Sequence, residues 1–150
     1  MSNTNTHAEA VRILEQCAKP VGFHASGLPG GYEALWARDS MITSLGALTL
    51  GEKFRGAVRA SIETLAVHQS PKGQIPNAVG DYNEERHSDV TFNSIDSTLW
   101  YLVGHHAFLE ATGDASLQET HRESIENALR WLGYQDPNED GLPVQQPTMD

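Results

Sequence analysis

The chain has 150 residues, a formal net charge of −10 at pH 7, 39% hydrophobic residues and 20% charged residues. This composition supports one domain with a hydrophobic core, and its acidity argues against nucleic acid and membrane surfaces as partners, because both favour basic patches. The single cysteine, Cys17, excludes a disulfide framework and a thiolate metal cluster. No apolar run is long enough to span a membrane, and the N-terminus MSNTNTHAEA does not resemble a signal peptide, so we expect a cytoplasmic protein.

Helical periodicity dominates the chain and predicts five helices. Their apolar positions, helix by helix, are Val11, Leu14 and Ala18; Met41, Ile42, Leu45 and Leu48; Val58, Ile62, Leu65 and Ala66; Ile95, Leu99, Leu102, Val103 and Ala107; and Leu117, Ile125, Leu129 and Leu132. The expected helix ends, in the same order, are Pro20, Gly51, a residue before Pro71, Gly113 and a residue near Gly133. Because no segment alternates between apolar and polar residues, we expect little sheet and an all-α fold.

The turns and loops that connect the helices repeat along the chain. The tight turns at Gly51 and Gly113 lie 62 positions apart, and the longer loops at Gly73 and Gly141 lie 68 positions apart. A recurring αα-hairpin of this period is typical of a stacked or ring-shaped helical array, in which the long loops gather at one end. A plain helical bundle with two similar turns is the alternative.

The segment YEALWARDSMI, residues 32–42, is the first candidate for a site. Trp36, Arg38 and Asp39 combine a flat apolar ring with groups that hydrogen-bond in pairs, which is what binding of a sugar requires. The structural alternative is a helix start at which Asp39 or Ser40 is the N-cap and Arg38 forms a surface ion pair.

The segment FNSIDSTLWYL, residues 92–102, is the second candidate. Ser94 is the expected N-cap, Asp96 lies in the first helical turn, and Trp100 follows on the same face. The helix dipole alone favours an acid at this position. The functional interpretation is a carboxylic acid beside an aromatic wall, whose pKa is raised by the apolar neighbour and lowered by the helix dipole.

The sequence predicts no metal site and no cofactor. His105 and His106 are adjacent in a helix, so their side chains point about 100° apart and cannot chelate one ion. Residues 136–141, DPNEDG, copy the opening of a calcium loop, but Pro147 occupies the position of its closing acid. No nucleophile elbow or phosphate-binding glycine motif is present. The acidic loop DYNEER, residues 81–86, is expected to be solvated, with one or two members lining a pocket.

These segments together resemble the six-hairpin glycosidases, most closely the amylo-α-1,6-glucosidase domain of glycogen-debranching enzymes and the neutral invertase-like enzymes. YEALWARDS is similar to their W-x-R-D segment, FNSIDSTLW to their Y-N-S-x-D-A-x-L-W segment, and GQIPN and DGLP to their loops between hairpins. The resemblance runs from about residue 31 to residue 150. Phe92 and Ser97 depart from it, because relatives often have Tyr and Ala there.

The resemblance implies the fold and the chemistry of a hydrolase. We expect residues 1–150 to form one region, the N-terminal portion of an (α/α)6 barrel, and a fragment of a longer chain because no helix closes the segment after Gln146. Asp96 would be the general acid of an inverting glycosidase, and the substrate-binding residues would be Trp36, Arg38, Asp39 and Trp100. The general base would lie beyond Asp150, so the isolated chain is expected to be inactive.

Two other functions stay open at this stage. The chain could be a non-catalytic helical module that binds carbohydrate or another partner, or it could belong with trehalases and oligosaccharide-processing α-glucosidases, which share the fold and the acid. The expected partner is a carbohydrate, namely a glucoside substrate, with no nucleic acid and no membrane.

Overall fold

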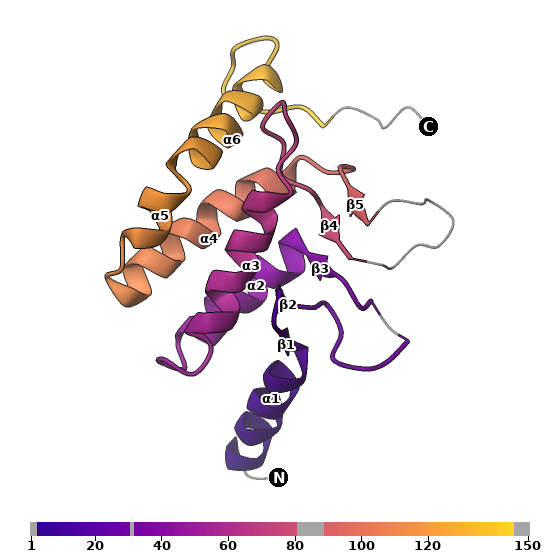
Figure 1. Cartoon of the computed structure of the whole chain (residues 1–150), viewed down its shortest axis with the longest axis vertical. Coiled ribbons are helices and arrows are strands. Elements are labelled where there is room, and N and C mark those ends of the chain that lie inside the picture. Colours follow the sequence, from indigo (N-terminus) through magenta and orange to yellow (C-terminus); the bar gives the residue numbers. More distant parts are fainter. Residues whose placement is uncertain (1–2, 31, 81–88, 146–150) are drawn as a thin grey trace.

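The computed structural model describes residues 3–30, 32–80 and 89–145, and in this part the chain is mainly helical (Figure 1). The all-α prediction is confirmed. The helices are α1 (Asn3–Cys17), α2 (Ala37–Leu48), α3 (Arg55–Val67), α4 (Asp96–Thr112), α5 (Ser116–Thr120) and α6 (Arg122–Tyr134). The strands have two residues each and are β1 (Ala18–Lys19), β2 (Gly22–Phe23), β3 (Leu35–Trp36), β4 (Ala78–Val79) and β5 (Val90–Thr91).

Two helical hairpins form the body of the chain, α2 with α3 and α4 with α5 and α6. The turns contain the predicted glycines, and both are left-handed, with φ of 74° at Gly51 and 68° at Gly113. A residue with a Cβ is disfavoured in this region, which explains the glycine in each turn. Gly113 is the C-cap of α4, whereas the C-cap of α2 is Thr49 and Gly51 follows it. At the second turn the Gly113 N–H donates to the Leu109 carbonyl at 2.7 Å and closes the end of α4.

The predicted fifth helix is wrong as a single element. It is divided at His121, where φ is −103° and ψ is 20°, into the short α5 and the longer α6. The apolar positions of the two pieces, Leu117 in α5 and Ile125 in α6, still pack on the same core. The break does not change the spacing of the apolar residues, so the helical periodicity of the sequence does not predict it.

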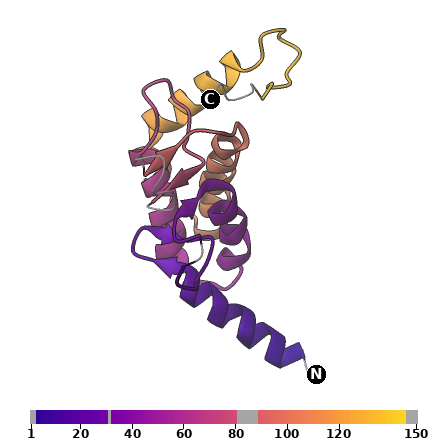
Figure 2. The same cartoon turned by 90° about the vertical axis from the view of Figure 1, so that its right-hand side faces the viewer.

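Helix α1 projects away from the two hairpins in both side views (Figures 1 and 2). Its end is fixed by the β1–β2 pair, in which Ala18 faces Phe23 and Lys19 faces Gly22. Phe23 is completely buried and its N–H donates to the Ser61 hydroxyl of α3 at 2.8 Å. The short β-hairpin thus anchors α1 to the core.

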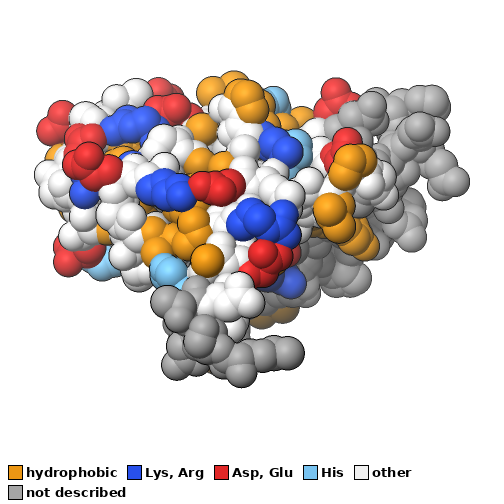
Figure 3. All heavy atoms as spheres, turned by 90° about the horizontal axis from the view of Figure 1, so that it is seen from below, with side chains coloured by type: hydrophobic (Ala, Val, Ile, Leu, Met, Phe, Trp, Pro, Cys, Tyr) orange, Lys and Arg blue, Asp and Glu red, His pale blue; other side chains and the backbone are white. Residues whose placement is uncertain are grey.

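Several apolar side chains of the two hairpins stay exposed. On α2 these are Ile42 and Leu45, and on α4 they are Leu99 and Val103, each exposed by 38–47%. Figure 3 shows the molecule from below, with hydrophobic side chains lying between basic and acidic groups. The apolar periodicity of α2 therefore marks a surface as well as the core.

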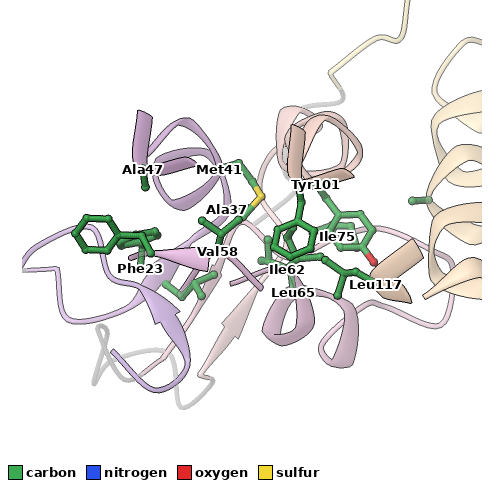
Figure 4. Packing of buried hydrophobic residues seen from close by; sticks show 14 residues of the cluster. Phe23, Ala37, Met41, Ala47, Val58, Ile62, Leu65, Ile75, Tyr101 and Leu117 are labelled. Carbon is green, nitrogen blue, oxygen red and sulfur yellow. The ribbon is translucent and has the colours of Figure 1, made fainter. Parts of the chain in front are cut away.

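The core lies where α2, α3 and α4 meet (Figure 4). Met41 of α2 packs against Gly104 of α4 and lies near Ile62 of α3, and all three are buried. The buried face of α2 is otherwise made of small residues, namely Ala37, Ser40, Ser44 and Ala47. Small side chains on one helix let the backbones approach closely, so α2 and α4 lie tightly side by side.

A three-stranded antiparallel sheet in the order β3-β4-β5 joins the loops at one end of these helices. Leu35 faces Val79 and Trp36 faces Ala78, while Ala78 also faces Thr91. Two-residue strands leave no alternating pattern in the sequence, in agreement with the expectation of little sheet. Because β3 runs directly into α2 and β5 precedes α4, the sheet brings the beginnings of these two helices together.

Candidate functional site

The candidate site lies at the starts of α2 and α4. Trp36 is the last residue of β3 and the residue before α2, with an extended backbone at φ −96° and ψ 125°. Arg38 is the second residue of α2, and Asp96 is the first residue of α4. The structural alternative, with Asp39 or Ser40 as the N-cap of α2, is not observed, and the expected N-cap Ser94 is wrong. The caps are Trp36 and Ile95, and neither makes a side-chain cap hydrogen bond.

Arg38 and Asp96 form an ion pair across the two helices, in which Arg38 Nε donates to Asp96 Oδ2. The Arg38 side chain is 59% exposed and that of Asp96 is 27% exposed. The resemblance assigned Arg38 and Asp96 to one substrate site, and the structure brings the two side chains into direct contact. The pair is open to solvent on the guanidinium side, where a polar ligand can reach it.

Opposing influences act on the Asp96 carboxyl. Partial burial raises its pKa, but the hydrogen bonds from Arg38 and Ser94 and the positive charge of Arg38 together hold the pKa below its ordinary value. The hydroxyls of Ser94 and Ser97 are 2.8 Å apart, so they form a small polar group beside the carboxyl. Asp96 is therefore an anion at neutral pH in this structure.

Aromatic rings flank the pair. Trp36 packs edge to face against Tyr32, with ring centroids 5.5 Å apart and an angle of 80° between the planes. Tyr32 is 64% exposed, whereas Trp36 is partly buried. Trp100, one turn after Asp96, is partly buried against the core cluster. The exposed Tyr32 ring suits stacking on a sugar, and it adds to the two partly buried rings that were predicted.

Asp39 is exposed and lies next to the ion pair. Its negative charge contributes to raising the pKa of Arg38, after the larger effects of the hydrogen bond and charge of Asp96. Of the residues predicted for the site, Arg38 and Asp96 are in direct contact, and Asp39 acts on Arg38 through its charge.

Two amide side chains that were not predicted also reach this end of the molecule. The Asn77 side chain accepts a hydrogen bond from the Asn93 N–H at 2.8 Å, and the Gln145 side chain contacts the backbone of Asn93 and Ile95. Asn77 belongs to the GQIPN loop, which the resemblance had marked. No feature of the sequence pointed to Gln145.

Some predictions fall outside the part that the structure describes, including the acidic loop 81–86 and the closing segment 146–150. Within the described ranges, no three residues of His, Cys, Asp or Glu gather so that they could hold a metal ion. In the same ranges, no helix combines the length and the apolar character needed to cross a membrane.

Comparison with known protein families identifies a match over most of the chain. The family model described as amylo-alpha-1,6-glucosidase matches residues 12–133, which include both hairpins and the Arg38–Asp96 pair. No curated protein and no solved structure matches the chain. Since the matched region covers most of the 150 residues and contains the site, the chain belongs to the amylo-alpha-1,6-glucosidase family.

Proposed function

We propose that these residues form part of an inverting glycosidase that cleaves α-1,6-linked glucose, with the substrate bound at the starts of α2 and α4. Family membership supports a carbohydrate substrate. The observation that carries the proposal is the contact between Arg38 and Asp96, which unites two distant motifs in one polar, partly exposed place. The single cysteine fits the cytoplasm as the location.

In this proposal Asp96 protonates the leaving oxygen, so it must be neutral when substrate is bound. The ion pair with Arg38 keeps it charged beforehand. A sugar hydroxyl that takes over the Arg38 guanidinium would remove the main stabilisation of the anion. Partial burial, which is the largest single influence on this carboxyl, then raises the pKa of Asp96. Substrate binding and acid activation are thereby coupled.

The other residues of the site hold the sugar. Arg38 and Asp39 offer a donor and an acceptor for neighbouring hydroxyls, and Trp36 with Trp100 shapes the apolar wall. The exposed Tyr32 ring, which packs on Trp36, extends that wall. We expect loss of Arg38 to weaken binding as well as turnover, because it acts in both.

Inversion also requires a second carboxylate about 6.5–9.5 Å from the first, to activate water. The resemblance to six-hairpin glycosidases implies that this carboxylate would lie on a later hairpin of an (α/α)6 barrel, to which residues 1–150 would contribute the N-terminal part. On this basis the 150-residue chain alone binds a glucoside without hydrolysing it, and turnover needs the remaining hairpins.

The test is the variant Asp96→Asn in a chain that completes the barrel. Hydrolysis is followed on an oligosaccharide with one α-1,6-linked glucose, beside an α-1,4-linked oligosaccharide and trehalose. We expect turnover of the α-1,6 substrate to fall by about 10²–10⁴-fold, because the amide cannot donate the proton. A preference for trehalose would move the enzyme to the trehalase-like alternative.

The matched control is Asp114→Asn. Asp114 also pairs with an arginine, Arg59, at 2.6 Å, but it lies in the turn after α4, at the other end of that helix. This variant removes a similar ion pair without touching the site, so turnover should stay within about twofold of the parent. An Asp96→Asn enzyme as active as the control would refute the role of Asp96.

The ionised state of Asp96 favours a second candidate, a module that binds carbohydrate without cleaving it. A permanent carboxylate accepts hydrogen bonds from sugar hydroxyls and the paired arginine donates to them, but the carboxylate cannot act as an acid. Calorimetry with the same oligosaccharides distinguishes the two. In the binding module the completed chain binds sugar and releases no glucose, and Asp96→Asn weakens binding instead of turnover.

A further inference from the structure

The turn before Asp96 is held by a side chain from far along the sequence. Gln145 Oε1 accepts a hydrogen bond from the Ile95 N–H at 2.8 Å, and Gln145 Nε2 donates to the Asn93 carbonyl at 3.1 Å. One amide therefore spans the turn with both of its functional groups. Gln145 follows α6 and is itself exposed, so its contact with this turn is not a consequence of core packing.

A second amide side chain, that of Asn77, also contacts this turn. Asn77 Oδ1 accepts from the Asn93 N–H at 2.8 Å. The backbone of Asn77 extends the connection, because its carbonyl accepts from the Ala37 N–H at 3.0 Å and its N–H donates to the Thr91 carbonyl at 2.8 Å. Asn77 thus contacts the first residue of α2 as well as the approach to α4.

These contacts replace the usual devices that fix a helix start. The Ile95 cap has no side-chain cap hydrogen bond, and the first N–H groups of any helix lack partners within the helix. Here both backbone groups of Asn93 and the N–H of Ile95 are satisfied by the two amides. Since Asp96 follows directly, the position of its carboxyl depends on how firmly residues 93–95 are held.

We propose that Asn77 and Gln145 are positioning residues that hold the turn 93–95 so that Asp96 meets Arg38. Neither amide is placed on the reacting sugar, and each acts through the backbone of the turn. The effect on turnover rests on the proposed glycosidase function, whereas the effect on the Arg38–Asp96 pair does not. The two can therefore be tested separately.

The primary test uses Gln145→Met in the 150-residue chain, because methionine keeps the length of the side chain and removes both amide bonds. Carbon-detected NMR titration of the Asp96 carboxyl measures its pKa, and hydrogen exchange measures protection of the Ile95 amide. We expect the pKa to rise by roughly 0.5–1 unit as the ion pair loosens, and exchange at Ile95 to accelerate about tenfold. Asn77→Leu should accelerate exchange at Asn93 similarly and move the Asp96 pKa in the same direction.

The control is Gln135→Met, which removes an amide from the same C-terminal region without touching residues 93–95. It should leave the Asp96 pKa and the exchange at Ile95 unchanged. A merely structural role for Gln145 would lower the free energy of unfolding without moving the Asp96 pKa, and that result would overturn the inference. Because Gln145 is exposed, its variant is expected to stay folded, and urea unfolding verifies this.

Turnover provides the link to the proposed function. In a chain that completes the barrel, Gln145→Met should lower kcat by about 10–100-fold with little change in KM, as expected for a displaced catalytic group. A shifted pKa in a chain that never hydrolyses glucosides would leave the positioning role intact and reject the enzyme. If the Asp96 pKa does not shift in the Gln145→Met variant while the parent enzyme is active, the positioning role is rejected and the proposed enzyme function stands.

Discussion

At the scale of single residues, the arrangement that matters most is the competition at Asp96 between burial and pairing. Its side chain is 27% exposed, so desolvation alone would favour the neutral acid. The nearby guanidinium reverses this preference and keeps the carboxylate charged. A residue poised between two such influences changes its protonation when the partner is drawn away, and the proposed role of Asp96 as general acid depends on that change.

His105 presents the opposite case, a titratable group that is buried and, among the described residues, has no hydrogen-bond partner. It is 3% exposed, and within the described part of the chain neither ring nitrogen has a hydrogen-bond partner. Tyr101 packs edge-on at 4.7 Å and His121 lies at 5.9 Å, both measured between ring centroids. Burial, followed by repulsion from His121, lowers the pKa of His105 to about 4.

This predicts that the fold weakens in mild acid. Between pH 6.5 and about 4 the unfolded chain binds a proton at His105 and the folded chain does not, so stability is complete above 6.5 and is lost as the pH falls. The loss approaches at most about 3 kcal/mol. His121, whose pKa burial also lowers despite the charge of Glu63, adds to it in the same direction.

Urea unfolding at pH 7 and pH 5 checks this expectation. His105→Phe keeps a ring against Tyr101 and removes the titration, so the difference in unfolding free energy between the two pH values should shrink. The neighbouring His106 is exposed, and His106→Asn should retain the difference seen in the parent. Equal pH dependence in the His105→Phe variant and the parent would contradict the assignment to His105.

At the scale of elements, the fold depends on the close contact of α2 with α4. A Cβ built on Gly104 would lie 2.2 Å from the Met41 sulfur, and Met41 is fully buried. We predict that Gly104→Ala destabilises the chain by about 1–3 kcal/mol through overpacking, although alanine is the better helix former. Gly46 of α2 has open space around it, so Gly46→Ala should stabilise by up to about 1 kcal/mol.

Thermal and urea unfolding of both glycine variants measures the two opposite effects. Met41→Ala combined with Gly104→Ala provides a further check, because the smaller side chain makes room for the new methyl group. The double variant should then cost less than the sum of the two single variants. Additive costs would mean that the contact does not limit the approach of the helices.

The helices and strands also show how much of the fold and of the site the sequence predicts. Apolar spacing and the glycines at positions 51 and 113 predicted α2, α3 and α4, because these signals act within a few residues. The break at His121 and the two-residue strands have no local pattern. Arg38 and Asp96 were identified by their segments, but their contact depends on β3 and β5 lying on either side of β4. The reach of Gln145 over 50 positions is set by tertiary structure alone.

At the scale of the whole molecule, the two hairpins leave an apolar surface beside the site. Arg38, Ile42 and Leu45 recur at the spacing of one face of α2, and Asp96, Leu99 and Val103 lie on one side of α4. The ion pair therefore stands at the end of two exposed apolar rows. Exposed rows of this kind favour association, either with further hairpins of a barrel or with other copies of the chain.

We predict that the 150-residue chain self-associates at high concentration through this surface, and that Ile42→Lys with Val103→Lys reduces the association. Ile42 is 47% and Val103 is 42% exposed, so the free energy of unfolding should change by less than about 0.5 kcal/mol for each substitution. Sedimentation velocity over a range of concentrations measures the effect. Val67 at the end of α3 is 77% exposed and belongs to neither row, so Val67→Lys should leave the association as it is in the parent. If Val67→Lys disperses the chain as well as the double variant does, net charge and not this surface governs the association.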